Sequence, residues 1–191
     1  MKRTVLWHSA ALPSMERSTF EFDKNGGGFT IQGTVLTLLG DDPAEIRYVT
    51  TCNSEGLTRA CAVEILAGEG IRSFRIHVSE RGQWIVNGVE APELSGVNDV
   101  DLSFSPCSNT LPVRRLKLPV GEKARIATAW LHFPELDIVR AEQIYTRLSD
   151  ERYRFETGTG DFSAELIIDD HGIVTTYGDL WQSLTPSDAD G

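Results

Sequence analysis

EIRYVTTCNSEGLTRACAVEI, residues 45–65, contains two runs in which apolar and polar side chains alternate on either side of a turn. Ile46 and Tyr48 share one face of the first run, and Cys61 opens the same pattern in the second. Alternation with a period of two is typical of a β-strand that buries one face. A hairpin closed at Asn53–Gly56 would place Cys61 opposite Tyr48. This stretch therefore predicts two antiparallel strands of a half-buried sheet.

The same alternation recurs along the chain, in residues 29–39, 73–79, 99–104 and 162–168. Turns rich in glycine, asparagine and aspartate separate the runs. Residues 138–148 fit neither the helix nor the strand template well, and we interpret them as a curved strand. Many short strands joined by such turns predict one antiparallel sheet, which must curl or close to hide its edges.

Helix is scarce in this pattern. The best candidate begins at Ser108 or Asn109, either of which is a good N-cap. It runs through Leu116 until Pro119 ends it. Pro112 would fall in the first turn of this helix, where its missing N–H does no harm. We therefore predict one short helix near the middle of the chain.

Length and charge narrow the class of protein. The chain has 191 residues and a formal net charge of −10, so we expect a single domain over residues 1–191 and no affinity for nucleic acid, which is bound through excess Lys and Arg. Acidic excess likewise opposes binding to an anionic membrane surface. No stretch approaches the roughly 18 apolar residues of a membrane span, and we expect no integral membrane association. Residues 185–191 are polar and are expected to fray.

Cysteine usage and the N-terminus favour a cytoplasmic protein. Three cysteines leave one unpaired in any disulfide arrangement, which suits a reducing compartment. The apolar run after Lys2-Arg3 stops at His8, short of the length that a secretory signal needs. The four histidines are scattered and no Cys-x-x-Cys is present, so we predict no metal site and no cofactor.

The carboxylates of Asp99 and Asp101 share one face of a predicted strand and lie about 7 Å apart. Such a pair could serve as acid and base in glycoside hydrolysis or hold a hard cation. Alternatively the two side chains face solvent or neutralise nearby arginines.

The second chemical feature is Arg114-Arg115, set between apolar residues. Neighbours on a helix lie about 100° apart, so at most one of the two guanidiniums can point squarely into a cavity. An arginine held there could receive a phosphate, a carboxylate or sugar hydroxyls through its planar fork. The alternative is an internal ion pair with Asp99 or Asp101, and the two interpretations are compatible.

The run NDVDLSFSPCSNTLPVRRL, residues 98–116, together with Gln143-Ile144-Tyr145 downstream, resembles the signature of the bacterial putative glycolipid-binding family. Gly82-Gln83-Trp84 and Ala164-Glu165-Leu166 match further pieces, so the resemblance covers nearly the whole chain. The run departs from the family pattern where it carries serine in place of threonine, and it has a cysteine between the two serines.

This resemblance implies a mainly β (α+β) fold: a spiral β-roll, barrel-like, in which one highly curved antiparallel sheet wraps around a single helix at Thr110–Leu116. It implies a non-catalytic protein that holds an amphipathic lipid or glycolipid between sheet and helix. We expect Asp101, Asn109, Arg114 and Arg115 to contact the headgroup. The alternatives are a hydrolase acting on a sugar or lipid ester through the two aspartates, or an interaction protein with a filled core and contacts such as homodimerisation along a sheet edge.

Overall fold

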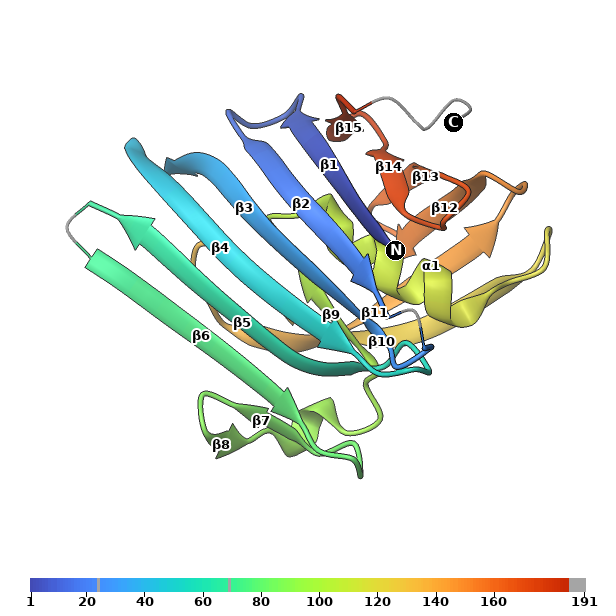
Figure 1. Cartoon of the computed structure of the whole chain (residues 1–191), viewed down its shortest axis with the longest axis horizontal. Helices are drawn as coiled ribbons and strands as arrows, with labels where there is room; N and C mark the ends of the chain where they lie inside the picture. The colour runs from blue at the N-terminus through green and yellow to red at the C-terminus, as the bar shows by residue number, and fades with distance from the viewer. Residues whose placement is uncertain (24, 69, 186–191) are drawn as a thin grey trace.

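The computed structural model describes residues 1–23, 25–68 and 70–185, which form one curved sheet around a short helix (Figure 1). The first eight strands are β1 (Lys2–Ser9), β2 (Met15–Phe22), β3 (Phe29–Leu39), β4 (Asp42–Cys52), β5 (Thr58–Ala67), β6 (Gly70–Val78), β7 (Trp84–Val86) and β8 (Val89–Glu90). The other seven are β9 (Asp99–Leu102), β10 (Lys123–Leu131), β11 (Ile138–Arg147), β12 (Arg152–Thr157), β13 (Ser163–Ile168), β14 (Val174–Tyr177) and β15 (Trp181–Ser183). The helical segments of the described residues are the 3₁₀ helices η1 (Pro92–Leu94) and η2 (Pro106–Asn109) and the α-helix α1 (Thr110–Leu116).

The order of strands places the first and the last strand side by side. From edge to edge the sheet runs β8-β7-β6-β5-β4-β3-β2-β1-β15-β14-β13-β12-β11-β10-β9. The predicted curved antiparallel sheet is thus confirmed, and residues 138–147 form a strand as expected. One pair differs: β9 and β10 are parallel, because the chain between them crosses over through α1.

The curvature of the sheet brings the edge strand β9 near the start of β5, which is the fourth strand from the other edge. The backbone N–H of Thr58, at the start of β5, donates to the carbonyl of Asn98, just before β9, at 3.0 Å. The Thr58 hydroxyl in turn accepts from the N–H of Val100 at 3.1 Å. These bonds join the edge strand β9 to β5, so the sheet curls around α1.

Side chains of the concave face and of α1 form the core. Its largest fully buried apolar members are Trp7, Phe20, Ile31, Ile46, Ile65, Leu94, Leu111, Leu131, Tyr145, Leu166 and Ile173. No helix among the described residues is long and apolar enough to cross a membrane.

One local expectation is corrected. In the hairpin of β4 and β5, Cys61 lies opposite Thr50 and not Tyr48, because pairing resumes only at Thr58 and the register shifts at Thr51. The two-residue difference leaves every side chain on its predicted face. At the start of the expected frayed tail, the Thr185 hydroxyl accepts from the N–H of Leu6 at 2.8 Å; residues 186–191 lie outside the described residues.

Candidate functional site

The helix α1 is positioned by the tight segment that follows β9. Ser105 caps this segment, because its hydroxyl accepts from the N–H of Cys107 at 3.2 Å and Pro106 occupies the first 3₁₀ position. Asn109 occupies the N-cap position of α1 as expected, but it is itself helical and its side chain makes no capping hydrogen bond. Lys117 takes the left-handed conformation, with φ of 46°, and ends the helix at Leu116 as expected.

Arg115 and Asp99 form a buried ion pair between α1 and β9. Arg115 Nη2 lies 2.5 Å from Asp99 Oδ2, and Nε lies 3.1 Å from Oδ1. The Asp99 side chain is fully buried and that of Arg115 is 14% exposed. Burial raises the pKa of Asp99, while the guanidinium counters part of this effect. The pair fixes the C-terminal part of α1 to the edge of the sheet.

Asp101 and Asn109 belong to a separate hydrogen-bond network that reaches β11. Asp101 accepts from the Ser108 hydroxyl at 2.7 Å and from Gln143 Nε2 at 2.6 Å. Tyr145 donates its phenolic proton toward Asn109 Oδ1 at 2.9 Å. Burial raises the pKa of Asp101 against the effect of these donors. The Gln-x-Tyr motif found in the sequence thus supplies the partners of two predicted site residues.

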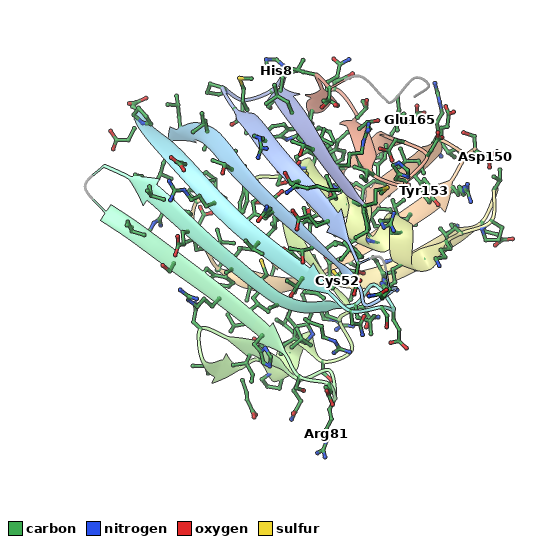
Figure 2. All side chains as sticks on the ribbon, in the orientation of Figure 1. His8, Cys52, Arg81, Asp150, Tyr153 and Glu165 are labelled. Carbon is green, nitrogen blue, oxygen red and sulfur yellow. The ribbon has the colours of Figure 1, made fainter. Side chains whose placement is uncertain are left out.

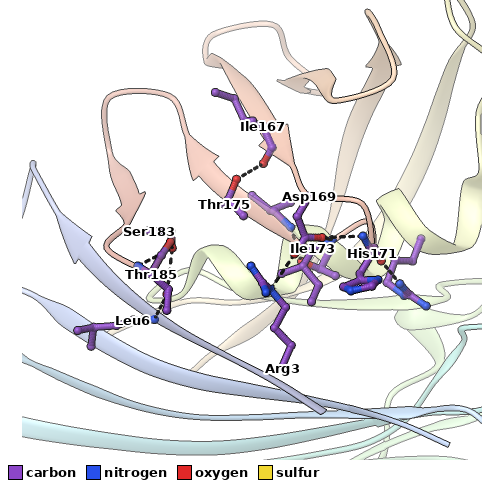
Figure 3. Close-up of polar contacts among 12 residues, drawn as sticks. Arg3, Leu6, Ile167, Asp169, His171, Ile173, Thr175, Ser183 and Thr185 are labelled. Atoms are coloured by element: carbon purple, nitrogen blue, oxygen red, sulfur yellow. Dashed lines mark hydrogen bonds and ion pairs between the residues drawn. The ribbon is translucent and has the colours of Figure 1, made fainter. Parts of the chain in front are cut away.

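Arg114 points away from Arg115, toward the turn at residues 169–172. Its guanidinium carbon lies 4.2 Å from the centroid of the Phe22 ring, and Nη1 donates to the backbone carbonyl of His171. That turn is held in place by Asp169, whose Oδ1 accepts from the N–H groups of His171 and Ile173, both at 2.9 Å (Figure 3). Arg3 of β1 pairs with the same carboxylate at 2.9 Å. The two adjacent arginines therefore contact different parts of the fold: Arg115 pairs with β9, and Arg114 binds the turn at residues 169–172.

A hollow of about 460 Å³ opens beside Arg114, between the C-terminal end of α1 and the strands β11–β13. Val113, Tyr153 and Ile168 form its apolar wall, and the exposed Lys117 also lines it. Figure 2 places Tyr153 on the side of the C-terminal strands, whereas Arg81 projects from the turn after β6 at the far end of the molecule. The volume falls in the range of small-molecule sites.

The four predicted site residues thus lie in three different places in the structure. Only Arg114 of the four lines this hollow, while Asp101 and Asn109 share the network described above and Arg115 is paired with Asp99. The hydrolase alternative requires both aspartates in an open cleft. Both carboxyls are instead hydrogen-bonded within the fold and lie outside the lining of the hollow.

Sequence reasoning missed a buried carboxyl on β2. Glu16 is fully buried, and its Oε1 accepts from the Tyr48 hydroxyl at 2.5 Å and from the Ser105 hydroxyl at 2.9 Å. Its Oε2 has no hydrogen-bond partner among the described residues. Burial raises the pKa of Glu16 to about 7 despite these donors. Glu16 and Phe20 lie an even number of residues apart and so share one face of β2. That spacing was the feature of the sequence that could have indicated the burial of Glu16.

Gly33 of β3 makes room for this network. It pairs with Tyr48 across the ladder, and a Cβ added at Gly33 would lie 2.4 Å from Tyr48 Cε1. We expect Gly33→Ala to lower the free energy of unfolding by about 1–3 kcal/mol, because the ring must move and overpacking strains the core. Urea denaturation of this variant beside Gly70→Ala, whose Cβ meets only an atom at 3.9 Å, measures the effect. Equal midpoints for the two variants would contradict it.

Comparison with known proteins agrees with the fold. A family model described as "Putative glycolipid-binding" matches residues 4–183. A crystal structure of a DUF1089 family protein from Pseudomonas aeruginosa is 26% identical, with a TM-score of 0.78 over 88% of this chain and 92% of that one. A beta-barrel-like DUF1849 protein from Brucella abortus matches at 11% identity and a TM-score of 0.53, over 95% of this chain and 93% of that one, which shows likeness of fold alone. No curated protein matches the chain. Since the family model spans nearly the whole sequence, including the run at 98–116 and the Gln-x-Tyr motif, the chain belongs to the putative glycolipid-binding family.

Proposed function

We propose that the protein binds an amphipathic glycolipid without transforming it, and that the headgroup enters the hollow beside Arg114. The observation that carries this proposal is the lining of that hollow. Val113, Tyr153 and Ile168 offer an apolar wall, while Arg114 and Lys117 offer hydrogen-bond donors. Sites for small ligands combine such apolar walls with a few polar groups that fix orientation. The family to which the chain belongs supports the same class of ligand.

Arg114 is suited to the polar end of such a ligand because it is already oriented. Its guanidinium stacks on Phe22 and is held by the carbonyl of His171, so little side-chain freedom is lost on binding. A planar fork with several N–H groups can donate to sugar oxygens while keeping these contacts. The apolar wall then contacts the part of the lipid next to the headgroup.

The direct test is native mass spectrometry of the purified protein titrated with glycolipids, together with melting temperatures in their presence. We expect a bound species and a rise in melting temperature, because a ligand that binds only the folded state stabilises it. Bare protein throughout, with no shift in melting temperature for any glycolipid, would refute the proposal.

The variant Arg114→Gln tests the site. We expect it to weaken glycolipid binding at least about tenfold, since a hydrogen bond from a charged group contributes about 1.5–3 kcal/mol. Arg81→Gln is the matched control, because it removes the same charge at the far end of the molecule. Titration calorimetry compares the two variants with the wild type. If Arg114→Gln binds as tightly as Arg81→Gln, the headgroup lies elsewhere.

A further inference from the structure

The turn at residues 169–172 separates two hollows. Beyond the hollow of about 460 Å³ on the Arg114 side, a second of about 290 Å³ lies on the other side of the turn, lined by Arg3, Ile167 and Thr175 among others. Glu151, Ile168 and residues 169–171 line both. The two hollows therefore adjoin at this turn, and we call them together the groove; its lining includes Arg3 of β1 and Arg147 of β11. Figure 3 shows Arg3, Ile167 and Thr175 around the turn.

Most cationic side chains that line this groove already make polar contacts within the fold. Arg147 donates to the carbonyls of Leu118 at 2.9 Å and Ser149 at 3.1 Å. Arg3 is paired with Asp169, and Arg114 is bound to the backbone of the turn. An anionic headgroup would have to compete with these partners for its donors.

Only some of the carboxylates that line this groove have partners within the fold. Asp169 is engaged by Arg3 and by two backbone N–H groups. Glu151 and Asp170 are exposed, and among the described residues their carboxylates have no hydrogen-bond or ion-pair partner; the same holds for the ammonium of Lys117. The groove thus keeps two acceptor groups and one cation available to a ligand, in a protein of net charge −10.

These facts separate two classes of headgroup. A phosphate would meet two carboxylates with no partner and a repulsive overall field, and like charges brought together cost affinity. Sugar hydroxyls both donate and accept, so they can bind carboxylates and the remaining N–H groups at the same time. Building repulsion against the wrong ligand is one of the two ways in which a site gains specificity.

We propose, on the basis of the function proposed above, that this groove selects an uncharged polyhydroxyl headgroup over an anionic phosphate headgroup, with Glu151 and Asp170 accepting from the sugar hydroxyls. Both residues line both hollows, so a headgroup in either hollow can reach them.

The test compares phosphatidylcholine vesicles that carry either a galactosyl diacylglycerol or phosphatidylglycerol. We expect binding to the galactolipid to be at least about tenfold tighter. In the double variant Glu151→Gln/Asp170→Asn the galactolipid affinity should fall about tenfold, and the preference over phosphatidylglycerol should shrink with it. The melting temperature should stay unchanged, because both side chains are exposed.

The matched control is Glu80→Gln/Glu93→Gln, which removes two exposed carboxylates from the β6–β7 turn and from η1. Both double variants raise the net charge by two, so a general electrostatic effect would move them equally. Equal losses in the two would overturn the assignment of Glu151 and Asp170. Binding to phosphatidylglycerol as tight as to the galactolipid would overturn the selectivity while leaving lipid binding intact. Binding to neither vesicle, nor to soluble alkyl glycosides, would overturn the proposed function itself.

Discussion

Replacing Arg115 with methionine is expected to lower the free energy of unfolding by about 3–5 kcal/mol at neutral pH. The substitution keeps most of the side-chain volume but leaves the fully buried Asp99 carboxylate without its bidentate partner. Removing one member of a buried ion pair is costly because the other charge stays desolvated. Urea denaturation followed by the tryptophan fluorescence of the chain measures the change.

Two controls make this expectation specific. Arg125→Met removes an ion pair with Glu142 in which both side chains are more than half exposed, and it should cost no more than about 1 kcal/mol. In the double variant Asp99→Asn/Arg115→Met neither member of this pair carries a charge, so part of the lost stability should return. If Arg115→Met lowers the free energy of unfolding no more than Arg125→Met does, the buried pair stabilises the fold no more than an exposed pair.

Glu16→Gln should be more stable than the wild type by about 3 kcal/mol at pH 8. The pKa of Glu16 is raised from 4.5 to about 7, and one pKa unit corresponds to about 1.36 kcal/mol. Because the folded state holds this proton more tightly, the wild type loses stability as pH rises from about 4.5 to about 7, and the loss is complete above that range. The neutral amide avoids this loss, so the two proteins should have nearly equal stability below pH 4.5.

Chemical denaturation at several pH values reveals the difference between the two curves. Glu122→Gln removes an exposed carboxyl and controls for the change in net charge. A difference between Glu16→Gln and the wild type that does not vary between pH 4.5 and pH 8 would contradict the assignment of this titration to Glu16.

The sequence was most informative where local rules act alone. Alternation at residues 45–52 and 61–65 decides which side chains face the core, and the structure confirms those faces even though the register of the hairpin differs. The short helix ends at Leu116 as expected, and the rule that neighbours on a helix diverge separates Arg114 from Arg115.

What the sequence could not supply depends on distant contacts. Glu16 lies in a strand that reads as polar, and its burial requires Tyr48 from β4 and Ser105 from the segment after β9. The location of the hollow depends on the turn at 169–172, which Arg3 anchors from the other end of the chain. The contact between Thr58 and Asn98 depends on the twist of all the strands that lie between β5 and β9 in the sheet, which no local pattern encodes.

The pairing of β1 with β15 has a consequence for how the chain is made. Strands β1 to β8 follow one another in the sheet, so each can pair as soon as it leaves the ribosome. The other edge of β1 waits for its partner, since Trp7 pairs with Ser183 and the intervening loop closes at a high cost in chain entropy. The chain is synthesised from the N-terminus at roughly 5–20 residues per second, so β1 is made well before β15. The strand that lies in the middle of the finished sheet is therefore an exposed edge for most of translation, and it is the place where a nascent chain is most open to pairing with a neighbour.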